Sequence, residues 1–346
     1  MPEALQHDKT PGSARLAHPT ISDALGPKPV ILVCIDRSCH GHRVLAHAGA
    51  FARAIGGELI LLRVLAPYFE NDCPLDPIDW EVRRREAGAA LAELAERGCI
   101  EAEIVLSHGY PADEICHQAT RCGAELIVLG RFGENIDDIG PTAGIGTTAR
   151  SVLECGHQQV LLVPENAQGT QTLRRILVPL DGSCWAESAL PDAMRLARSS
   201  GAEIVLAHIV TFPEFVCPTP PESVDMELRE RIMDRNTRAA TRYLERQRAM
   251  LAEQGVVVRA CIDTGPDARI SLLKMLRDHA FDLVVLSARG SGFRHLPGLH
   301  FGSVAAHLSL HSATPLLIMR PDTETTHRNS QRDSVATGSV QAASHP

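Results

Sequence analysis

The sequence is poor in the residues that several large classes of protein require. Aromatic side chains make up only 4% of the 346 residues, and the net charge is −8, from 34 Lys and Arg against 42 Asp and Glu. Proteins that bind nucleic acid generally present a basic surface, and those that bind single strands stack the bases on aromatic rings. We therefore expect no nucleic-acid partner.

Long apolar runs are also missing. No run approaches the roughly 20 apolar residues that cross a bilayer, and the first residues contain no apolar stretch of the kind found in signal peptides. We expect a soluble, cytoplasmic protein with no membrane partner.

Cysteine is present, but not in the spacings of disulfide frameworks or zinc sites. The 10 cysteines are scattered, and no CxxC pair occurs. The densest group of metal-type ligands, Cys39-His40-Gly41-His42, lacks further ligands at a convincing spacing. We interpret it as a loop at the start of a helix and expect no metal site.

What the sequence does contain is an internal duplication. The segment ILVCIDRSC at 31–39 returns as ILVPLDGSC at 176–184, so that Asp36 matches Asp181. An Ala-rich helix, an apolar strand, a Pro-rich loop and a long helix follow in both copies. Each copy then continues with a third strand, a helix, a fourth strand, a glycine-rich loop, a short helix and a fifth strand. A repeat of this length indicates two copies of one domain.

The alternation of strands and helices predicts the fold. Such an order favours right-handed crossovers and a parallel sheet, and near-continuous Ile, Leu and Val runs indicate a sheet covered on both faces. We predict an α/β protein with two tandem, doubly wound, Rossmann-like domains, each with a five-stranded parallel sheet, at 28–165 and 173–321. A linker is predicted at 166–172, and polar, aperiodic composition predicts disordered tails at 1–27 and 322–346.

Polar residues and glycines follow the first and fourth strands, where ligands of such sheets bind. Asp36 and Asp181 can accept hydrogen bonds from a ligand, although an Asx turn before a helix is the alternative interpretation. After the fourth strand, glycine-rich loops run into Gly146-Thr147 and Gly302-Ser303. Backbone N–H groups and a hydroxyl at a helix start suit phosphate oxygens.

These segments resemble the universal stress protein family, as a tandem member with two domains of the UspA type. The strongest are ILVPLDGS at 176–183, GYPADEICHQATRCGAELIVLGRFG at 109–133 and FGSVAAHLSLHSATPLLIMRP at 301–321. The resemblance covers nearly everything except the tails. It implies an adenine nucleotide alpha hydrolase-like fold, binding of ATP with or without Mg²⁺, and a role in stress response.

The nucleotide-binding branch of that family carries Gly-x2-Gly-x9-Gly-Ser/Thr after the fourth strand. It also uses the aspartate after the first strand and a backbone contact at the end of the second. For the second domain, the resemblance implies an ATP site made of Pro179, Leu180, Asp181, Ile209, Gly290, Gly292, Gly302, Ser303 and Val304. For the first domain, it implies the matching positions Asp36, Val64, Gly130, Gly133, Gly146 and Thr147.

The glycine motif of the second domain departs from the family pattern, and two alignments stay open. With Gly292 as the second glycine, the nine-residue spacer to Gly302 is kept, but Arg289 replaces the first glycine. With Gly290 as the second glycine, Ser287 stands first and the spacer grows to eleven residues.

The first domain keeps Gly130-x2-Gly133, but its spacer to Gly146 has twelve residues and includes Glu134. That carboxylate, with Asp137 and Asp138 close by, would repel phosphates. We therefore expect the ATP site in the second domain, while the first is degenerate or holds nucleotide in a rearranged loop.

No catalytic signature is present, since the sequence lacks both GxxxxGK[ST] and a protein-kinase motif. We expect an ATP-binding module that acts through nucleotide-dependent conformation or through a protein partner of unknown identity, with slow hydrolysis at most. The alternative is an interaction module of the same fold without nucleotide. An adenylyl-type transferase is disfavoured, because HxGH and SGGxD are missing.

The family resemblance also implies how the domains pair. Members commonly pair through the fifth strand, which here reads VLLV at 160–163 and LLIM at 316–319. An apolar edge strand needs covering. We predict an intramolecular pseudo-dimer through these strands, and pairing of two chains into a homodimer stays open.

Overall fold

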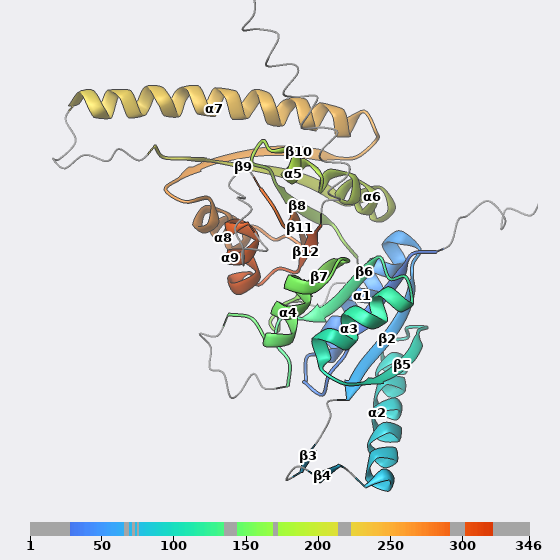
Figure 1. Cartoon of the computed structure of the whole chain (residues 1–346). Coiled ribbons are helices and arrows are strands. Elements are labelled where there is room, and N and C mark those ends of the chain that lie inside the picture. The colour runs from blue at the N-terminus through green and yellow to red at the C-terminus, as the bar shows by residue number, and fades with distance from the viewer. Residues whose placement is uncertain are drawn as a thin grey trace, which may run out of the picture.

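The computed structural model describes most of the chain between residues 28 and 320 (Figure 1). The described ranges are 28–65, 69–70, 73–74, 76–134, 144–168, 172–213, 223–290 and 302–320. We term residues 28–168 the first half and residues 172–320 the second half. The tails predicted at 1–27 and 322–346, and residues 169–171 of the predicted linker, lie outside the described residues.

The first half alternates strands and helices as the sequence predicts. Its elements are β1 (Val30–Cys34), α1 (Gly41–Ile55), β2 (Glu58–Leu65), the short β3 (Phe69–Glu70) and β4 (Cys73–Pro74), α2 (Pro77–Arg97), β5 (Glu103–His108), α3 (Pro111–Arg121), β6 (Leu126–Gly130), α4 (Thr147–Cys155) and β7 (Gln159–Val163).

Among the described residues, the second half repeats this order without counterparts of β3 and β4 and with its first helix divided in two. Its elements are β8 (Arg175–Pro179), α5 (Cys184–Glu187), α6 (Leu190–Ser200), β9 (Glu203–Thr211), α7 (Ser223–Ala252), β10 (Val258–Gly265), α8 (Ala268–Asp278), β11 (Leu283–Ser287), α9 (Ser303–His311) and β12 (Leu316–Met319). The Ala-rich helix predicted here is split into α5 and α6, because Pro191 stands in the first turn of α6 and cannot continue a preceding helix.

Ten of the described strands form one sheet, in the order β10-β9-β8-β11-β12-β7-β6-β1-β2-β5, and β3 and β4 form a separate antiparallel pair. Within the large sheet every pairing inside a half is parallel, whereas β12 and β7 pair antiparallel, with Leu317 opposite Leu161. The predicted α/β fold and the pairing of the two fifth strands are therefore confirmed. In the second half the chain winds outward from β8 to β10 and then crosses back to β11, so the strand order reverses between β9 and β11.

Two apolar cores cover the two faces of this sheet, and each runs through both halves. Helices α1, α2, α6 and α7 pack on one face, over strand residues such as Val33 and Val178. Helices α3, α4, α8 and α9 pack on the other, over Leu32 and Leu177. Neighbouring residues of one strand thus point into different cores, which explains why the strands are continuous apolar runs.

Two arginines donate hydrogen bonds from one half to the other beside the β7–β12 pairing. Arg131, which follows β6, pairs with Glu165 and donates to the backbone oxygens of Leu310 and Ser312 at the end of α9. Arg320, which follows β12, donates to backbone oxygens at the end of α4 in the first half. Each half therefore caps the carboxyl end of a helix in the other. We term this region the seam.

Among the described helices, none combines the length and the apolar character needed to span a bilayer.

Candidate functional site

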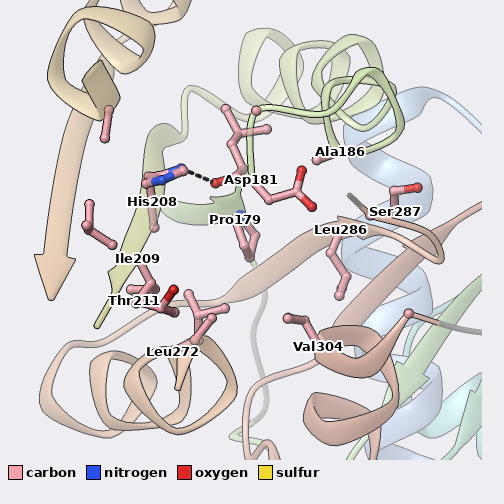
Figure 2. A pocket seen from close by; sticks show the side chains of 18 of the residues that line it. Pro179, Asp181, Ala186, His208, Ile209, Thr211, Leu272, Leu286, Ser287 and Val304 are labelled. Carbon is pink, nitrogen blue, oxygen red and sulfur yellow. Dashed lines mark hydrogen bonds between the residues drawn. The ribbon is translucent and has the colours of Figure 1, made fainter. Parts of the chain in front are cut away.

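A cavity of about 660 Å³ opens at the carboxyl ends of β8, β9 and β11, between α7 and the α8–α9 side of the second half (Figures 1 and 2). This is the point where the strand order reverses, as is typical of ligand sites in such sheets. Its volume lies within the range of about 300–1,000 Å³ that small-molecule sites occupy. Eight residues predicted from the sequence line it: Pro179, Leu180, Asp181, Ile209, Gly290, Gly302, Ser303 and Val304.

Asp181 is held in an Asx turn directly after β8. Its Oδ1 accepts hydrogen bonds from the backbone N–H of Ser183 at 3.0 Å and from the hydroxyl of Ser183 at 2.6 Å. The Ser183 oxygen accepts in turn from the N–H of Ala186 and caps α5. Gly182 has φ +83°, a conformation that favours glycine. The turn that the sequence suggested as an alternative is therefore present, and it presents the Asp181 carboxylate to the cavity.

The fourth strand and α9 form the opposite wall of the cavity. The N–H of Gly302 donates to the backbone oxygen of Ala288 at 2.7 Å, which brings the start of α9 beside the end of β11. Gly302, the residue before α9, has no side chain that could cap the helix. The N–H groups of Ser303 and Val304 donate to no other described residue, so they can donate to a ligand. A helix start of this kind at a cavity favours an anion.

The structure resolves the alignment of the second glycine motif. The N–H groups of Ala288 and Arg131 make equivalent bonds to the fifth strands, both at 2.8 Å. Gly290 is therefore equivalent to Gly133, and Ser287 is equivalent to Gly130. A Cβ built on Gly290 or Gly133 would lie 2.7 Å or 2.8 Å from Oδ2 of the matching aspartate, so both positions require close backbone approach. Gly292, the other candidate, lies outside the described residues.

The end of β9 carries two contacts that sequence reasoning missed. Nδ1 of His208 lies 2.8 Å from the backbone oxygen of Leu180 (dashed in Figure 2), so in the neutral ring Nδ1 carries the hydrogen and Nε2 is an acceptor. The ring meets Tyr243 of α7 edge to face, at 6.3 Å between centroids. The Tyr243 hydroxyl donates to Glu187 at 2.9 Å. Burial, and secondarily Glu187, raise the pKa of Tyr243, so it stays protonated.

The remaining wall of the cavity is apolar and comes from the two flanking helices. Sequence reasoning missed it, because nothing in a charged helix marks which turn will face the strand ends. The only signal was a patch of small residues in an otherwise charged segment. The lining residues of α7 and α8 are Asn236, Ala239, Ala240, Tyr243, Ala268 and Leu272.

Charge at the cavity is mixed. The guanidinium of Arg289 lies 5.3 Å from the ring centre of Trp185 and lines the cavity together with Asp181. Within the described ranges, no three His, Cys, Asp or Glu side chains converge as metal ligands. The arrangement therefore offers N–H donors and an arginine at one end, a carboxylate acceptor beside them, and an apolar slot.

The first half brings its predicted residues together in the same way. Ser38 N–H donates to Oδ1 of Asp36 at 2.9 Å, and Gly146 N–H donates to the backbone oxygen of Arg131 at 2.8 Å. Gly130 ends β6, Thr147 begins α4, and Val64 lies near the end of β2. The backbone geometry of the two strand-end regions is thus closely matched.

The side chains of the first half differ at three places. Oε1 of Glu134 accepts from the backbone N–H of Arg37 at 2.8 Å, so a carboxylate of the protein lies over the β1 loop. Leu62, which is 1% exposed, stands where Ala207 lines the cavity of the second half. Arg63 stands where the second half has His208, and burial lowers its pKa. Asp137 and Asp138 lie outside the described residues.

Comparison with known proteins agrees with the repeat. The model of the Universal stress protein family matches residues 29–164 and again residues 172–320. The universal stress protein YxiE of Bacillus subtilis is 29% identical over 154 residues, which are 42% of this chain and 98% of that protein.

Solved structures show the same fold. A universal stress protein from Archaeoglobus fulgidus superposes with a TM-score of 0.62 at 20% identity, covering 84% of this chain and 98% of that one. Protein PA1789 of Pseudomonas aeruginosa, described as functionally unknown, superposes with a TM-score of 0.58 at 17% identity, covering 89% and 98%.

Proposed function

Because the chain belongs to the universal stress protein family, we propose that its second half binds ATP in the cavity at the ends of β8, β9 and β11. The observation that carries this proposal is the uncapped start of α9, which faces the same cavity as Asp181 and the end of β9. Binding would act in stress response or signalling, through nucleotide-dependent conformation or partner binding.

The residues of the cavity would make three kinds of contact with the nucleotide. The N–H groups of Ser303 and Val304, with the Ser303 hydroxyl, would receive phosphate oxygens. Asp181 would accept from a ribose hydroxyl. The backbone at Ile209 would meet the edge of adenine, whose faces suit the apolar walls. Mg²⁺, where present, would be held chiefly through the phosphates, as is usual for this ion.

The first half is proposed as a supporting domain, with boundaries at 28–165 for the first domain and 173–321 for the second. The contact between Glu134 and Arg37 supports this division, because a carboxylate beside the β1 loop repels phosphates. The competing function is an interaction module that binds no nucleotide. We favour this function for the first half only.

Binding can be tested by titrating the full chain with ATP and Mg²⁺ in a calorimeter. Asp181→Ala removes one acceptor and is expected to weaken affinity about tenfold or more, since hydrogen bonds to charged groups contribute about 1.5–3 kcal/mol. The matched variant Asp36→Ala changes the equivalent turn of the first half and should leave affinity unchanged.

Gly302→Val is expected to abolish binding by filling the phosphate region. A Cβ on Gly302 meets no described atom closer than 3.5 Å, and circular dichroism checks that the variant folds. Retained affinity in both second-half variants, with loss in Asp36→Ala, would place the site in the first half. A wild-type chain that neither binds ATP nor retains nucleotide after purification would favour the interaction module.

A further inference from the structure

Four cysteines of the first half gather around α3, away from the cavity. Cys34 lies on β1, Cys116 on α3, Cys122 directly after α3, and Cys155 at the end of α4. Burial raises the pKa of the Cys34 thiol, and the neighbouring Cys116 and Cys122 raise it further. Cys155 is exposed and Cys116 half-buried. This thiol cluster therefore runs from the core to the surface.

The two outer members of the cluster meet where α3 packs against α4. Sγ of Cys116 lies 3.7 Å from the point where a Cβ on Gly156 would be, and Gly156 directly follows Cys155. The two thiols also interact electrostatically, and the Cys155 thiol adds to the raised pKa of Cys116. Cys116 thus sits against the turn that carries Cys155, with no described element between them.

The second half supplies a positive charge to this place. The guanidinium of Arg320 donates to the backbone oxygens of Val152 and Leu153 in the last turn of α4. It lies close enough to Cys116 and Cys155 that both thiols affect its pKa. A neighbouring cation stabilises a thiolate, which is the reactive form of cysteine. The seam therefore completes a thiol site that the first half alone does not possess.

We propose that Cys116, Cys155 and Arg320 form a peroxide-reactive site in which the two cysteines close a reversible disulfide. The Cys155 thiolate attacks one oxygen of hydrogen peroxide, the O–O bond breaks, and the hydroxide released takes up a proton as water. The Cys116 sulfur then attacks the sulfenic acid of Cys155, and the S–S bond forms as a second water leaves. Two thiols are oxidised and one peroxide is reduced to two waters.

The exposure of the two thiols sets the order in which they react. Cys155 is reached from solvent, whereas burial keeps the pKa of Cys116 raised, so Cys116 acts second as the resolving thiol. Cys34 lies deeper and stays reduced, because its thiolate is disfavoured further.

The site is tested on the full chain by adding hydrogen peroxide, alkylating the remaining thiols and digesting with trypsin without reduction. Cleavage at arginine places Cys116 in peptide 98–121 and Cys155 in peptide 151–174. We expect these peptides joined, with the loss of two hydrogens, and separated again by a thiol reductant. Peptide 98–121 also holds Cys99, so Cys99→Ser must keep the link, while Cys155→Ser and Cys116→Ser must each abolish it.

A link through Cys99 or Cys122, or Cys155 driven to sulfinic acid while Cys116 stays a free thiol, would overturn the proposed pair. The contribution of Arg320 to the rate is measured separately. Arg320→Met should slow disulfide formation by about threefold or more, since removing the cation raises the pKa of Cys116 further and slows its attack on the sulfenic acid. Arg269→Met, which removes an arginine of an exposed pair with Asp267 outside the seam, should not change the rate. Equal rates in wild type and Arg320→Met would exclude the arginine from the site.

Discussion

The two halves share one backbone design at their strand ends but carry different side chains there. Asp36 and Asp181 make the same Asx turn, and Gly133 and Gly290 lie against these aspartates at nearly the same distance. Yet Leu62 fills in the first half the place that Ala207 leaves to the cavity in the second. Side-chain size and charge, not topology, therefore decide whether a strand end becomes a site.

The long helices α2 and α7 also differ in their side chains between the two halves. Each buries an alanine and, four residues later, a leucine: Ala87 and Leu91 in α2, Ala240 and Leu244 in α7. Counted from the turns that end the helices, where Cys99 and Gly255 both have positive φ and donate to the oxygens of Glu96 and Ala252, the position of Ala239 at the cavity corresponds to Arg83 in the first half. The second half lines its slot with methyl groups where the first presents a charge.

The largest expected effect is on the free energy of unfolding and concerns the seam. The first half supplies Arg131 there, whereas the second half has Ala288 at the equivalent position. Arg131→Met leaves the Glu165 carboxylate and the backbone oxygen of Ser312 without this donor. Removing one partner of a buried pair costs about 3–5 kcal/mol of unfolding free energy. Urea unfolding monitored by circular dichroism measures it.

A matched control is Arg269→Met, which breaks the exposed pair with Asp267 and should leave the urea midpoint nearly unchanged. Equal losses in the two variants would show that Arg131 does not hold the halves together.

The second prediction exchanges the residues that distinguish the two strand ends. Ala207→Leu should lower ATP affinity about tenfold or more, equivalent to ~1.4 kcal/mol, because the new side chain enters the cavity. Because Ala207 is only 1% exposed and belongs to the core, the larger side chain also crowds its neighbours and should lower the unfolding free energy by about 1–3 kcal/mol. Calorimetric titration and urea unfolding separate the two effects.

The reciprocal variant Leu62→Ala should destabilise the chain by about 2–5 kcal/mol, as for other large-to-small changes in a core. It should not add a second equivalent of bound ATP, because Glu134 and Arg63 remain. A second equivalent would show that Leu62 alone closes the first half.

The smallest expected effect is on the pH dependence of stability, which should have opposite signs at two equivalent helix positions. His47 of α1 and Asp192 of α6 stand at the same place in the repeat. Burial lowers the pKa of His47 and raises the pKa of Asp192. The unfolded chain protonates His47 near pH 6.5, and the folded chain only at lower pH. His47 therefore lowers stability as the pH falls below about 6.5, while Asp192 opposes folding at neutral pH and less so in acid.

Thermal unfolding between about pH 7 and pH 5 tests both signs. His47→Gln should lose less Tm on acidification than the wild type, and Asp192→Asn should gain Tm at neutral pH. Parallel Tm curves for wild type and His47→Gln would contradict the assignment to His47.

Much of this architecture follows from the sequence because it depends on local patterns. The repeat of ILVCIDRSC as ILVPLDGSC, the apolar strands and the Gly-Thr and Gly-Ser helix starts are each legible within a few residues. The parallel pairing of the strands within each half follows from their alternation with helices. Cys39-His40-Gly41-His42 was correctly interpreted as a loop and helix start, since α1 begins at Gly41.

Other features could not be predicted, because they depend on how distant segments meet. The two alignments of the second glycine motif were equal in sequence, and only the shared bond to the fifth strand identified Gly290 as the equivalent of Gly133. The bond between Tyr243 and Glu187 joins positions 56 residues apart. The split between α5 and α6 was missed although Pro191 marks it.

The sequence by itself determined the strands, the helices and their repetition, because hydrophobic periodicity and turn residues act over short range. Tertiary structure decided where the cavity of the second half lies, which helix turn lines it and which thiols lie near an arginine from the other half. These outcomes depend on packing across the sheet and the seam, where one side chain such as Leu62 or Ala207 fills or leaves space according to what lies opposite.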